Sequence, residues 1–329
     1  MRYESDLHSA QSESTREVFI GDIPIDILTM EETVRRIGEK LHARPFGQIV
    51  ISGVNAHFVN FARKDPRFKT IMRSNSINVA DGVSLVLSSF LLRPKLPERV
   101  PGIDLMLALL SLASEKGKSV YLLGGREGAA EKAAVEITKR LPNLKIVGID
   151  RPPIGKEFDH AVAFAIRERI RAVEPDFLFV CFGVPKQEYW IQEFARDLPV
   201  RVLMGNGAAF DVLAGFFRRP PQGIQDLGLE WLYRLLKEPR RLWYRYSIGN
   251  LKFALIVFLQ LFQPRTRAGL ANSGWSAREG LVHSWPEAVG ERKGDAQASA
   301  PDLPWGVQSE GGIADDGGTG DEVRIGRAV

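Results

Sequence analysis

The sequence predicts an α/β fold, with a Rossmann-like parallel sheet flanked by helices. Two observations lead to this class. Short, almost continuously apolar runs alternate with amphipathic helical stretches between residues 18 and 219, and small or polar residues follow most of these runs. Strands of a parallel sheet have this composition because helices cover both faces of the sheet. We expect right-handed crossovers between successive strands.

Six apolar runs are the predicted strands, at residues 48–52, 77–80, 119–123, 145–149, 177–182 and 201–204. Helix-like stretches at 56–73 and 129–140 separate two pairs of them. The only cysteine, Cys181, lies inside one of these runs, which favours a small buried side chain over a nucleophile. One cysteine cannot form an internal disulfide, so a reducing, cytoplasmic compartment fits the sequence.

Composition divides the 329 residues, which carry a mild formal charge of +4, into four parts. Residues 1–17 are polar and lack the apolar core of a signal peptide, so we expect them to be disordered. Residues 18–219 form the α/β domain, and residues 220–264 form a basic and aromatic helical appendage. Residues 265–329 are rich in glycine, serine, aspartate and proline, which predicts disorder. No run reaches the roughly 18 to 20 apolar residues that span a membrane, so we expect a soluble or peripheral protein.

Five clusters of small or polar residues follow predicted strands, at residues 52–55, 80–82, 124–128, 183–188 and 205–207. Ligands of open parallel sheets bind beyond the carboxyl ends of the strands. Glycines there let backbone N–H groups approach a diphosphate, so the clusters indicate a nucleotide-type ligand. The sequence contains neither the dinucleotide fingerprint GxGxxG nor a P-loop, which argues against a dehydrogenase and a kinase.

Asp81 is the strongest candidate for a catalytic base. It follows one predicted strand directly and precedes Gly82, a position that directs the carboxylate into the ligand cleft. Inverting sugar transfer needs a carboxylate that accepts the proton of the attacking hydroxyl group. An aspartate at this position is equally consistent with a helix N-cap.

Lys186 and Gln187 follow Pro185 at the end of another predicted strand. Lys186 could neutralise a leaving diphosphate, and Gln187 could donate a hydrogen bond to a sugar or phosphate. The same residues are also consistent with the ordinary polar first turn of a helix that begins at a proline.

Several motifs in this sequence resemble those of the WecG/TagA/CpsF glycosyltransferase family, and they occur in the family's order between about residues 18 and 262. They are Asn78-Val-Ala-Asp-Gly82, Arg99-Val-Pro-Gly-Ile-Asp104, Val120-Tyr-Leu-Leu-Gly-Gly125, Gly183-Val-Pro-Lys-Gln-Glu188, Gly205-Asn-Gly-Ala-Ala-Phe-Asp211, Gly228-Leu-Glu-Trp-Leu-Tyr-Arg234 and Glu238-Pro-Arg-Arg241. The chain departs from the family at Gly53, where many members have threonine, and at Asn206, where they have valine.

The resemblance implies an inverting, metal-independent enzyme without a cofactor. It would move a hexose from a UDP-sugar to a saccharide linked to undecaprenyl diphosphate, in the synthesis of exopolysaccharide or cell-envelope polysaccharide. N-acetylmannosamine, its uronic acid and glucose are the sugars used in the family. The alternative is a regulatory protein on the same fold that binds a nucleotide-sugar or a lipid.

The resemblance also implies roles for individual residues. Asp81 would be the general base, and Gln187 would line the active site. Arginines of the appendage would complete the site and contact the diphosphate. The predicted substrate-binding residues are Asn55, Arg99, Asp104, Gly124, Gly125, Lys186, Gly205, Asn206, Gly207, Arg234, Arg240 and Arg241.

The appendage mixes arginine and lysine with tryptophan and tyrosine between residues 231 and 246, and an apolar run follows at 253–262. Cationic and aromatic side chains favour an anionic membrane surface, and the apolar run is too short to span it. We therefore expect a cytoplasmic protein that is peripheral on the inner face of the membrane, and the sequence leaves a homo-oligomer open. A plain core helix at 251–262 is the alternative, and the sheet-edge clusters argue against nucleic acid as a partner.

Overall fold

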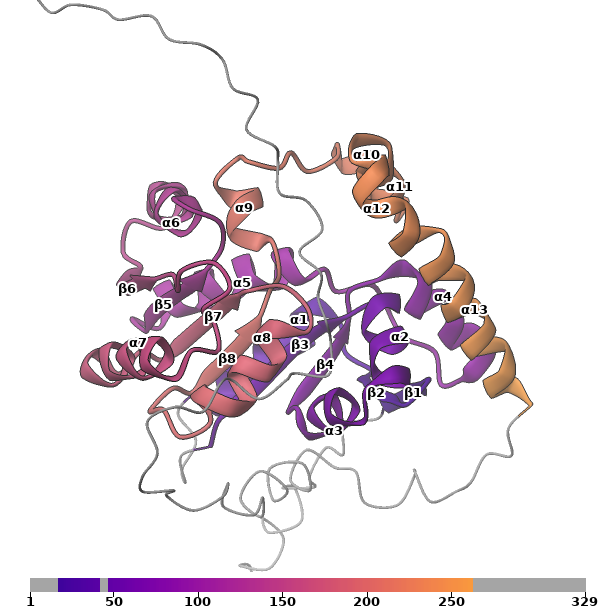
Figure 1. Cartoon of the computed structure of the whole chain (residues 1–329), viewed down its shortest axis with the longest axis horizontal. Coiled ribbons are helices and arrows are strands. Elements are labelled where there is room, and N and C mark those ends of the chain that lie inside the picture. The colour runs from indigo at the N-terminus through magenta and orange to yellow at the C-terminus, as the bar shows by residue number, and fades with distance from the viewer. Residues whose placement is uncertain (1–16, 42–46, 263–329) are drawn as a thin grey trace, which may run out of the picture. The chain divides into compact units, whose positions relative to one another are not determined.

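The structure is a computed structural model that describes residues 17–41 and 47–262. Its centre is a parallel sheet of six strands, in the order β4-β3-β8-β7-β5-β6 (Figure 1). The strands are β3 (Ile49–Val54), β4 (Ile77–Ala80), β5 (Ser119–Gly124), β6 (Lys145–Asp150), β7 (Phe177–Cys181) and β8 (Val202–Gly205). All five strand pairs are parallel, so the predicted α/β class and its parallel sheet are confirmed.

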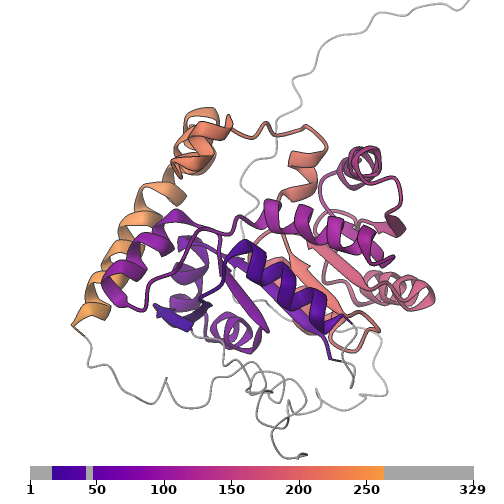
Figure 2. The ribbon, with the colours of Figure 1, turned by 180° about the vertical axis from the view of Figure 1, so that it is seen from behind.

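Two hydrophobic cores lie on the two faces of the sheet, because successive strand residues point to opposite sides. One core packs the sheet against α1 (Met30–Lys40), α5 (Gly102–Glu115), α6 (Ala129–Arg140) and α9 (Ala209–Leu213). The other packs it against α7 (His160–Val173), α8 (Lys186–Trp190) and the π-helical turn η1 (Ile191–Ala195). Figure 2 shows α1 and α5 on the face turned away from the viewer in Figure 1.

The predicted helix at 56–73 is two helices, α2 (Ala56–Lys64) and α3 (Pro66–Ser74). Pro66 lacks an N–H group and cannot continue α2, so the chain bends at Asp65. The Asp65 carboxylate then accepts hydrogen bonds from the N–H groups of Arg67 and Phe68, at 2.9 and 3.1 Å, and caps α3.

A short antiparallel hairpin, β1 (Glu17–Ile20) and β2 (Ile23–Asp26), precedes the sheet and was not predicted. Gly21 makes its turn with a φ of 61°, a conformation that favours glycine. The hairpin packs beside β4 and α4 (Val83–Leu92). Asp26 is buried there and accepts a hydrogen bond from the Asn78 N–H group at 2.7 Å.

The appendage forms four helices, α10 (Gln222–Asp226), α11 (Glu230–Lys237), α12 (Pro239–Tyr246) and α13 (Ile248–Leu261). Helix α13 packs against α2 and α4 (Figure 1) and buries Phe253 and Val257. The Gln260 amide accepts from the Gly21 N–H group and donates to the Phe19 carbonyl group, both at 2.8 Å. These contacts hold α13 to the hairpin.

The predicted disordered segments 1–17 and 265–329 lie outside the described residues, apart from Glu17, which begins β1. Within the described part of the chain, no helix is both long and apolar enough to cross a membrane.

Candidate active site

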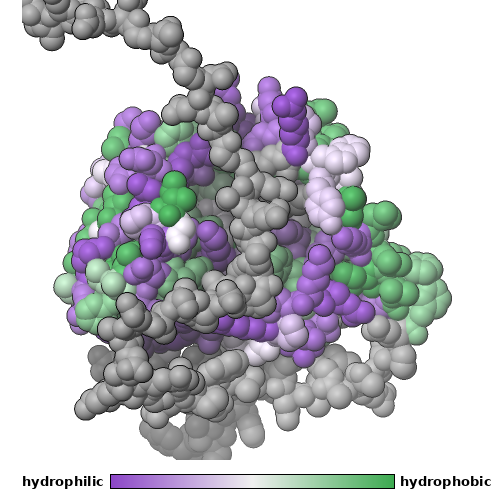
Figure 3. Space-filling view, in the orientation of Figure 1, coloured by the Kyte–Doolittle hydropathy of each residue, from purple (hydrophilic) through white to green (hydrophobic). Residues whose placement is uncertain are grey.

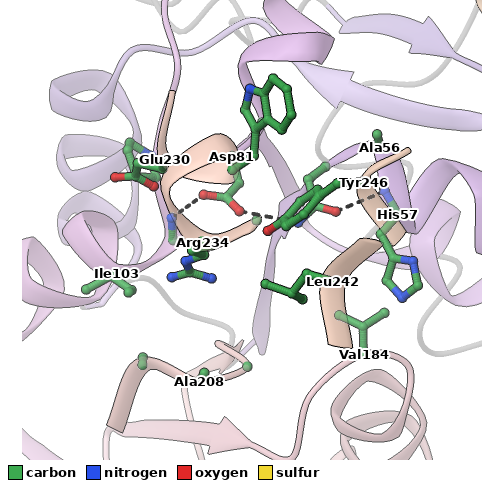
Figure 4. Close-up of a pocket in the computed structure, with 18 of the residues that line it drawn as sticks. Ala56, His57, Asp81, Ile103, Val184, Ala208, Glu230, Arg234, Leu242 and Tyr246 are labelled. Carbon is green, nitrogen blue, oxygen red and sulfur yellow. Dashed lines mark hydrogen bonds between the residues drawn. The ribbon is translucent and has the colours of Figure 1, made fainter. Parts of the chain in front are cut away.

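A cleft of about 900 Å³ lies beyond the carboxyl ends of strands β3, β4, β7 and β8. Parallel strands present their ligand-binding loops at this edge. Helices α11 and α12 of the appendage form the facing wall of the cleft (Figure 4). The sheet side supplies Gly53, Asn55, Asp81, Gln187, Asn206 and Gly207, and the appendage supplies Glu230, Trp231, Tyr233, Arg234 and Tyr246.

Asp81 follows β4 and lines the cleft. Its Oδ1 atom accepts a hydrogen bond from the Gly102 N–H group at 2.9 Å, and its Oδ2 atom lies 3.4 Å from the Asn55 amide nitrogen. Gly82, and not Asp81, is the N-cap of α4. The carboxylate instead binds the first N–H group of α5, so the capping interpretation applies to a different helix from the one that follows Asp81.

Burial raises the pKa of the Asp81 carboxyl group, because the ionised form loses solvation. The hydrogen bonds from Gly102 and Asn55 and the charge of Arg99 lower this pKa, and the charge of Glu230 raises it. A carboxylate of raised pKa is a stronger base than a solvated one. The arrangement therefore suits Asp81 for proton abstraction.

Gln187 joins two of the loops that line the cleft. Its side chain is 1% exposed, and its Oε1 atom accepts from the N–H groups of Gly183 and Gly207, at 3.2 and 2.7 Å. A β-carbon at Gly205 would lie 2.8 Å from the Gln187 amide nitrogen, so glycine at 205 gives this side chain its space. The same nitrogen donates to the buried carboxyl group of Glu188 at 2.7 Å. Burial raises the pKa of Glu188 to about 8.

Asn206 connects the loop after β8 to the start of α5. Its amide nitrogen donates to the Gly102 carbonyl group at 2.9 Å, and Gly102 in turn donates its N–H group to Asp81. Gly53 lies beside the same group, since a β-carbon there would be 3.4 Å from the Asp81 β-carbon. Both positions at which the chain departs from the family's motifs therefore lie next to Asp81 or its hydrogen-bond donor.

Among the residues whose side chains are described, four arginines line the cleft, namely Arg99, Arg218, Arg219 and Arg234. The Glu230 Oε1 atom lies 3.3 Å from an Arg99 guanidinium nitrogen and 3.5 Å from one of Arg219. Asp104 holds Arg219 through two bonds of 2.6 and 3.0 Å. Among the described residues, Arg218 and Arg234 form no ion pair. The cleft thus presents guanidinium groups that an anionic ligand can reach.

Other predicted residues lie outside the cleft lining. Lys186 pairs with Glu157 at 3.0 Å. Gly124 ends β5 and Gly125 follows it, with φ angles of 104° and 80°. Asp104 is connected to the cleft through its ion pair with Arg219.

Of the two arginines predicted on α12, Arg240 falls outside the residues that line the cleft. Arg240 lies on an exposed surface of the helix, and the side chain of Arg241 is outside the described part of the structure. Of the predicted appendage arginines, Arg234 lines the cleft (Figure 4).

The sequence did not single out Glu230, Arg218 or Arg219 as site residues. Glu230 belongs to the motif Gly228-Leu-Glu-Trp, and this motif could have indicated it as a site residue. Arg219 could be found only from the fold, because its partner Asp104 is 115 residues away in the sequence.

Among the described residues, no three or more His, Cys, Asp or Glu side chains lie close enough together to hold a metal ion. Metal independence remains a prediction, and its test is given below.

Comparison with known proteins gives three findings. A profile of the glycosyl transferase WecG/TagA/CpsF family matches residues 18–267. Two proteins of Staphylococcus aureus, from strains MW2 and MRSA252, are each 31% identical to this chain over 254 residues, which is 77% of this chain and 95% of the relative. Both are named N-acetylglucosaminyldiphosphoundecaprenol N-acetyl-beta-D-mannosaminyltransferase. A periplasmic substrate-binding protein of Ralstonia solanacearum aligns over 77% of this chain and 66% of its own, with a TM-score of 0.29 and 12% identity, which is too weak to bear on the fold.

Proposed function

Because this chain belongs to the WecG/TagA/CpsF family of glycosyltransferases, we propose that it transfers a hexose from a UDP-sugar to a saccharide linked to undecaprenyl diphosphate. The family match confirms the resemblance drawn from the sequence motifs. The names of the Staphylococcus aureus relatives support a lipid-linked N-acetylglucosamine as the acceptor and N-acetylmannosamine as the transferred sugar. The uronic acid of that sugar and glucose are the alternatives.

The observation that carries this proposal is the position of Asp81 in a cleft lined by arginines. Asp81 takes the proton of an acceptor hydroxyl group, whose oxygen attacks the anomeric carbon of the sugar and forms the new glycosidic bond. The bond from that carbon to the UDP oxygen breaks, and the electron pair leaves with UDP. Attack from the face opposite UDP inverts the anomeric configuration.

The leaving UDP carries negative charge, which Arg99 and Arg234 are placed to neutralise from opposite walls of the cleft. Guanidinium groups suit this task because they bind phosphate oxygens in a bidentate manner and stay charged. Gln187 contributes by holding the N–H groups of Gly183 and Gly207 at the cleft.

A membrane surface is the proposed site of action, since the acceptor is a lipid. Exposed apolar side chains gather on α13 and α4, and Figure 3 shows a green patch on the α13 side of the molecule. They are Leu251, Leu255, Phe258 and Leu259 on α13, Phe262 directly after it, and Leu87, Phe90 and Leu91 on α4. Lys95 lies 4.8 Å above the Phe90 ring, and Lys252 lies on α13 itself. Apolar side chains bordered by cations favour the surface of an anionic membrane.

The direct test is UDP release from a panel of UDP-sugars in the presence of a short-chain prenyl-diphosphate acceptor that carries N-acetylglucosamine. We expect turnover with UDP-N-acetylmannosamine and a loss of roughly 100-fold or more in Asp81→Asn, the scale of a positioned base. Asp81→Asn keeps the size of the side chain, so circular dichroism and UDP binding should match the wild type. UDP binding without transfer to any acceptor would instead favour the regulatory alternative.

A further inference from the structure

Glu230 is an acidic side chain within a cleft that, on the proposed function, binds a diphosphate. It begins α11, and its single atom Oε1 contacts both Arg99 and Arg219. The side chains of Arg99, Glu230 and Arg219 are 17%, 21% and 24% exposed, so water screens their charges only partly. A carboxylate in this place competes with any phosphate that approaches the same two guanidinium groups.

The two arginines differ in how firmly they are held. Arg219 keeps its position through the bidentate pair with Asp104, whether or not Glu230 is present. Arg99 lies in the segment before α5, and its one ion pair among the described residues is with Glu230. Arg99 is therefore held less firmly than Arg219, and a phosphate group of a ligand could replace Glu230 as its partner.

Arg234, which forms no ion pair among the described residues, lies on the same helix as Glu230. Arg234 is one helical turn after Glu230 on α11, so the two side chains are neighbours on the helix surface. A diphosphate that binds Arg234 and Arg99 would meet the Glu230 carboxylate between them. Charge repulsion at such separations is worth a few-fold to tenfold in affinity in a partly solvated site.

We propose that Glu230 is a positioning residue that acts as an internal counter-ion of the diphosphate site. It pairs with Arg99 in the free enzyme, yields Arg99 to the diphosphate of the bound donor, and pairs with Arg99 again as UDP leaves. Glu230 thereby limits the affinity for UDP and assists its release. This inference rests on the proposed function, because it needs a nucleotide diphosphate in the cleft.

The test compares UDP binding by calorimetry in the wild type, Glu230→Gln, Glu230→Asp and Arg99→Gln. Glu230→Gln keeps the size of the side chain and removes its charge, so we expect UDP to bind about three- to tenfold more tightly. Glu230→Asp keeps the charge and should stay within about twofold of the wild type. Uridine, which has no phosphate, should bind all four proteins equally and reports an intact cleft.

Steady-state kinetics give a second measurement. In Glu230→Gln the KM for the UDP-sugar should fall, and kcat should fall or stay level, because release of UDP becomes slower. If Glu230 only anchored α11, its replacement would loosen the helix, move Arg234 and weaken UDP binding. The sign of the change in affinity therefore separates the two roles.

The outcomes also separate this inference from the proposed function. If wild-type protein fails to bind UDP, the proposed function is wrong. If the wild type binds UDP and Arg99→Gln weakens binding, while Glu230→Gln binds UDP no more tightly than the wild type, the counter-ion role is wrong and the proposed function stands.

Discussion

Replacing Gln187 with leucine should both destabilise the protein and lower its activity. Leucine has nearly the same size but cannot accept the hydrogen bonds from the N–H groups of Gly183 and Gly207. It also leaves the buried carboxyl group of Glu188 without the amide donor that now lies 2.7 Å away. The change therefore acts on two cleft loops and on one buried acid.

The size of the effect follows from these three bonds. Gly183 and Gly207 are partly buried, so water can replace part of each lost hydrogen bond. Each loss therefore lowers the free energy of unfolding by about 1 kcal/mol. Glu188 is 3% exposed, and leaving it without a partner costs about 1 to 3 kcal/mol. Burial of the apolar leucine side chain stabilises the variant by roughly 1 kcal/mol. We expect the free energy of unfolding to fall by about 2 to 4 kcal/mol.

Urea unfolding followed by circular dichroism measures the stability, and UDP release measures the activity. Gln48→Leu is a matched control, because the Gln48 amide also makes two bonds to backbone groups, at 3.0 Å to Ala195 and 2.8 Å to Leu198. Gln48 lies just before β3, at the opposite edge of the sheet from the cleft. The control should lose stability and keep its turnover, whereas Gln187→Leu should lose at least about tenfold in turnover at a temperature where both are folded.

Unfolding of Gln187→Leu within 0.5 kcal/mol of the wild type, where surface substitutions usually fall, would refute the hydrogen-bond argument. Equal turnover in the two leucine variants would show that the Gln187 bonds do not shape the cleft.

Three other predictions follow from the structure. Turnover should survive EDTA, because the arginines and N–H groups of the cleft can neutralise the diphosphate; a loss of activity that manganese or magnesium restores would contradict this. Glu188→Gln should be more stable than the wild type at pH 9 by at least about 1 kcal/mol. The pKa of Glu188 is raised in the folded protein, so between about pH 5 and 8 the carboxyl group ionises in the unfolded chain but stays protonated in the folded one, and the wild type loses stability as the pH rises. Urea unfolding at pH 5 and pH 9 measures this loss, and equal pH dependence of the two proteins would show that Glu188 is solvated. Phe258→Ser should weaken binding to phosphatidylglycerol vesicles roughly tenfold. Phe164→Ser changes a similarly exposed phenylalanine on α7 and should bind like the wild type. Equal binding by the two variants would show that α13 does not contact the membrane.

The sheet could be predicted because its strands are apolar on both faces. The run at 77–80 became β4 and the helix at 129–140 became α6 at the predicted residues. The hairpin β1–β2 was missed because each strand has only four residues, too few to establish a period. The break between α2 and α3 was visible in advance, since Asp65-Pro66 is a strong signal for the end of a helix.

The site was harder to predict because it depends on which way neighbouring side chains point. Lys186 and Gln187 are consecutive, yet Gln187 turns into the cleft loops and Lys186 turns to Glu157. Successive residues of a helix point about 100° apart, so a single step along α8 leads from a residue of the surface to a residue of the cleft. The strand that precedes them fixes where this helix begins, but the orientation of each side chain depends on tertiary contacts.

The appendage illustrates how the cleft depends on distant parts of the chain. Asn55 is the N-cap of helix α2, and its amide lies 3.4 Å from Asp81. Five residues later, the Asn60 amide donates to the Gly249 carbonyl group at 2.7 Å. The same helix therefore contacts the catalytic side and the start of α13. The bonds of Gln260 to the hairpin hold the far end of α13. Fixed at these two points, α13 sets the position of α12 and α11, and with them the distance of Arg234 from Asp81. A chain that ended before α10 would keep its sheet and Asp81, but it would lack the wall of the cleft that carries Arg234 and Glu230.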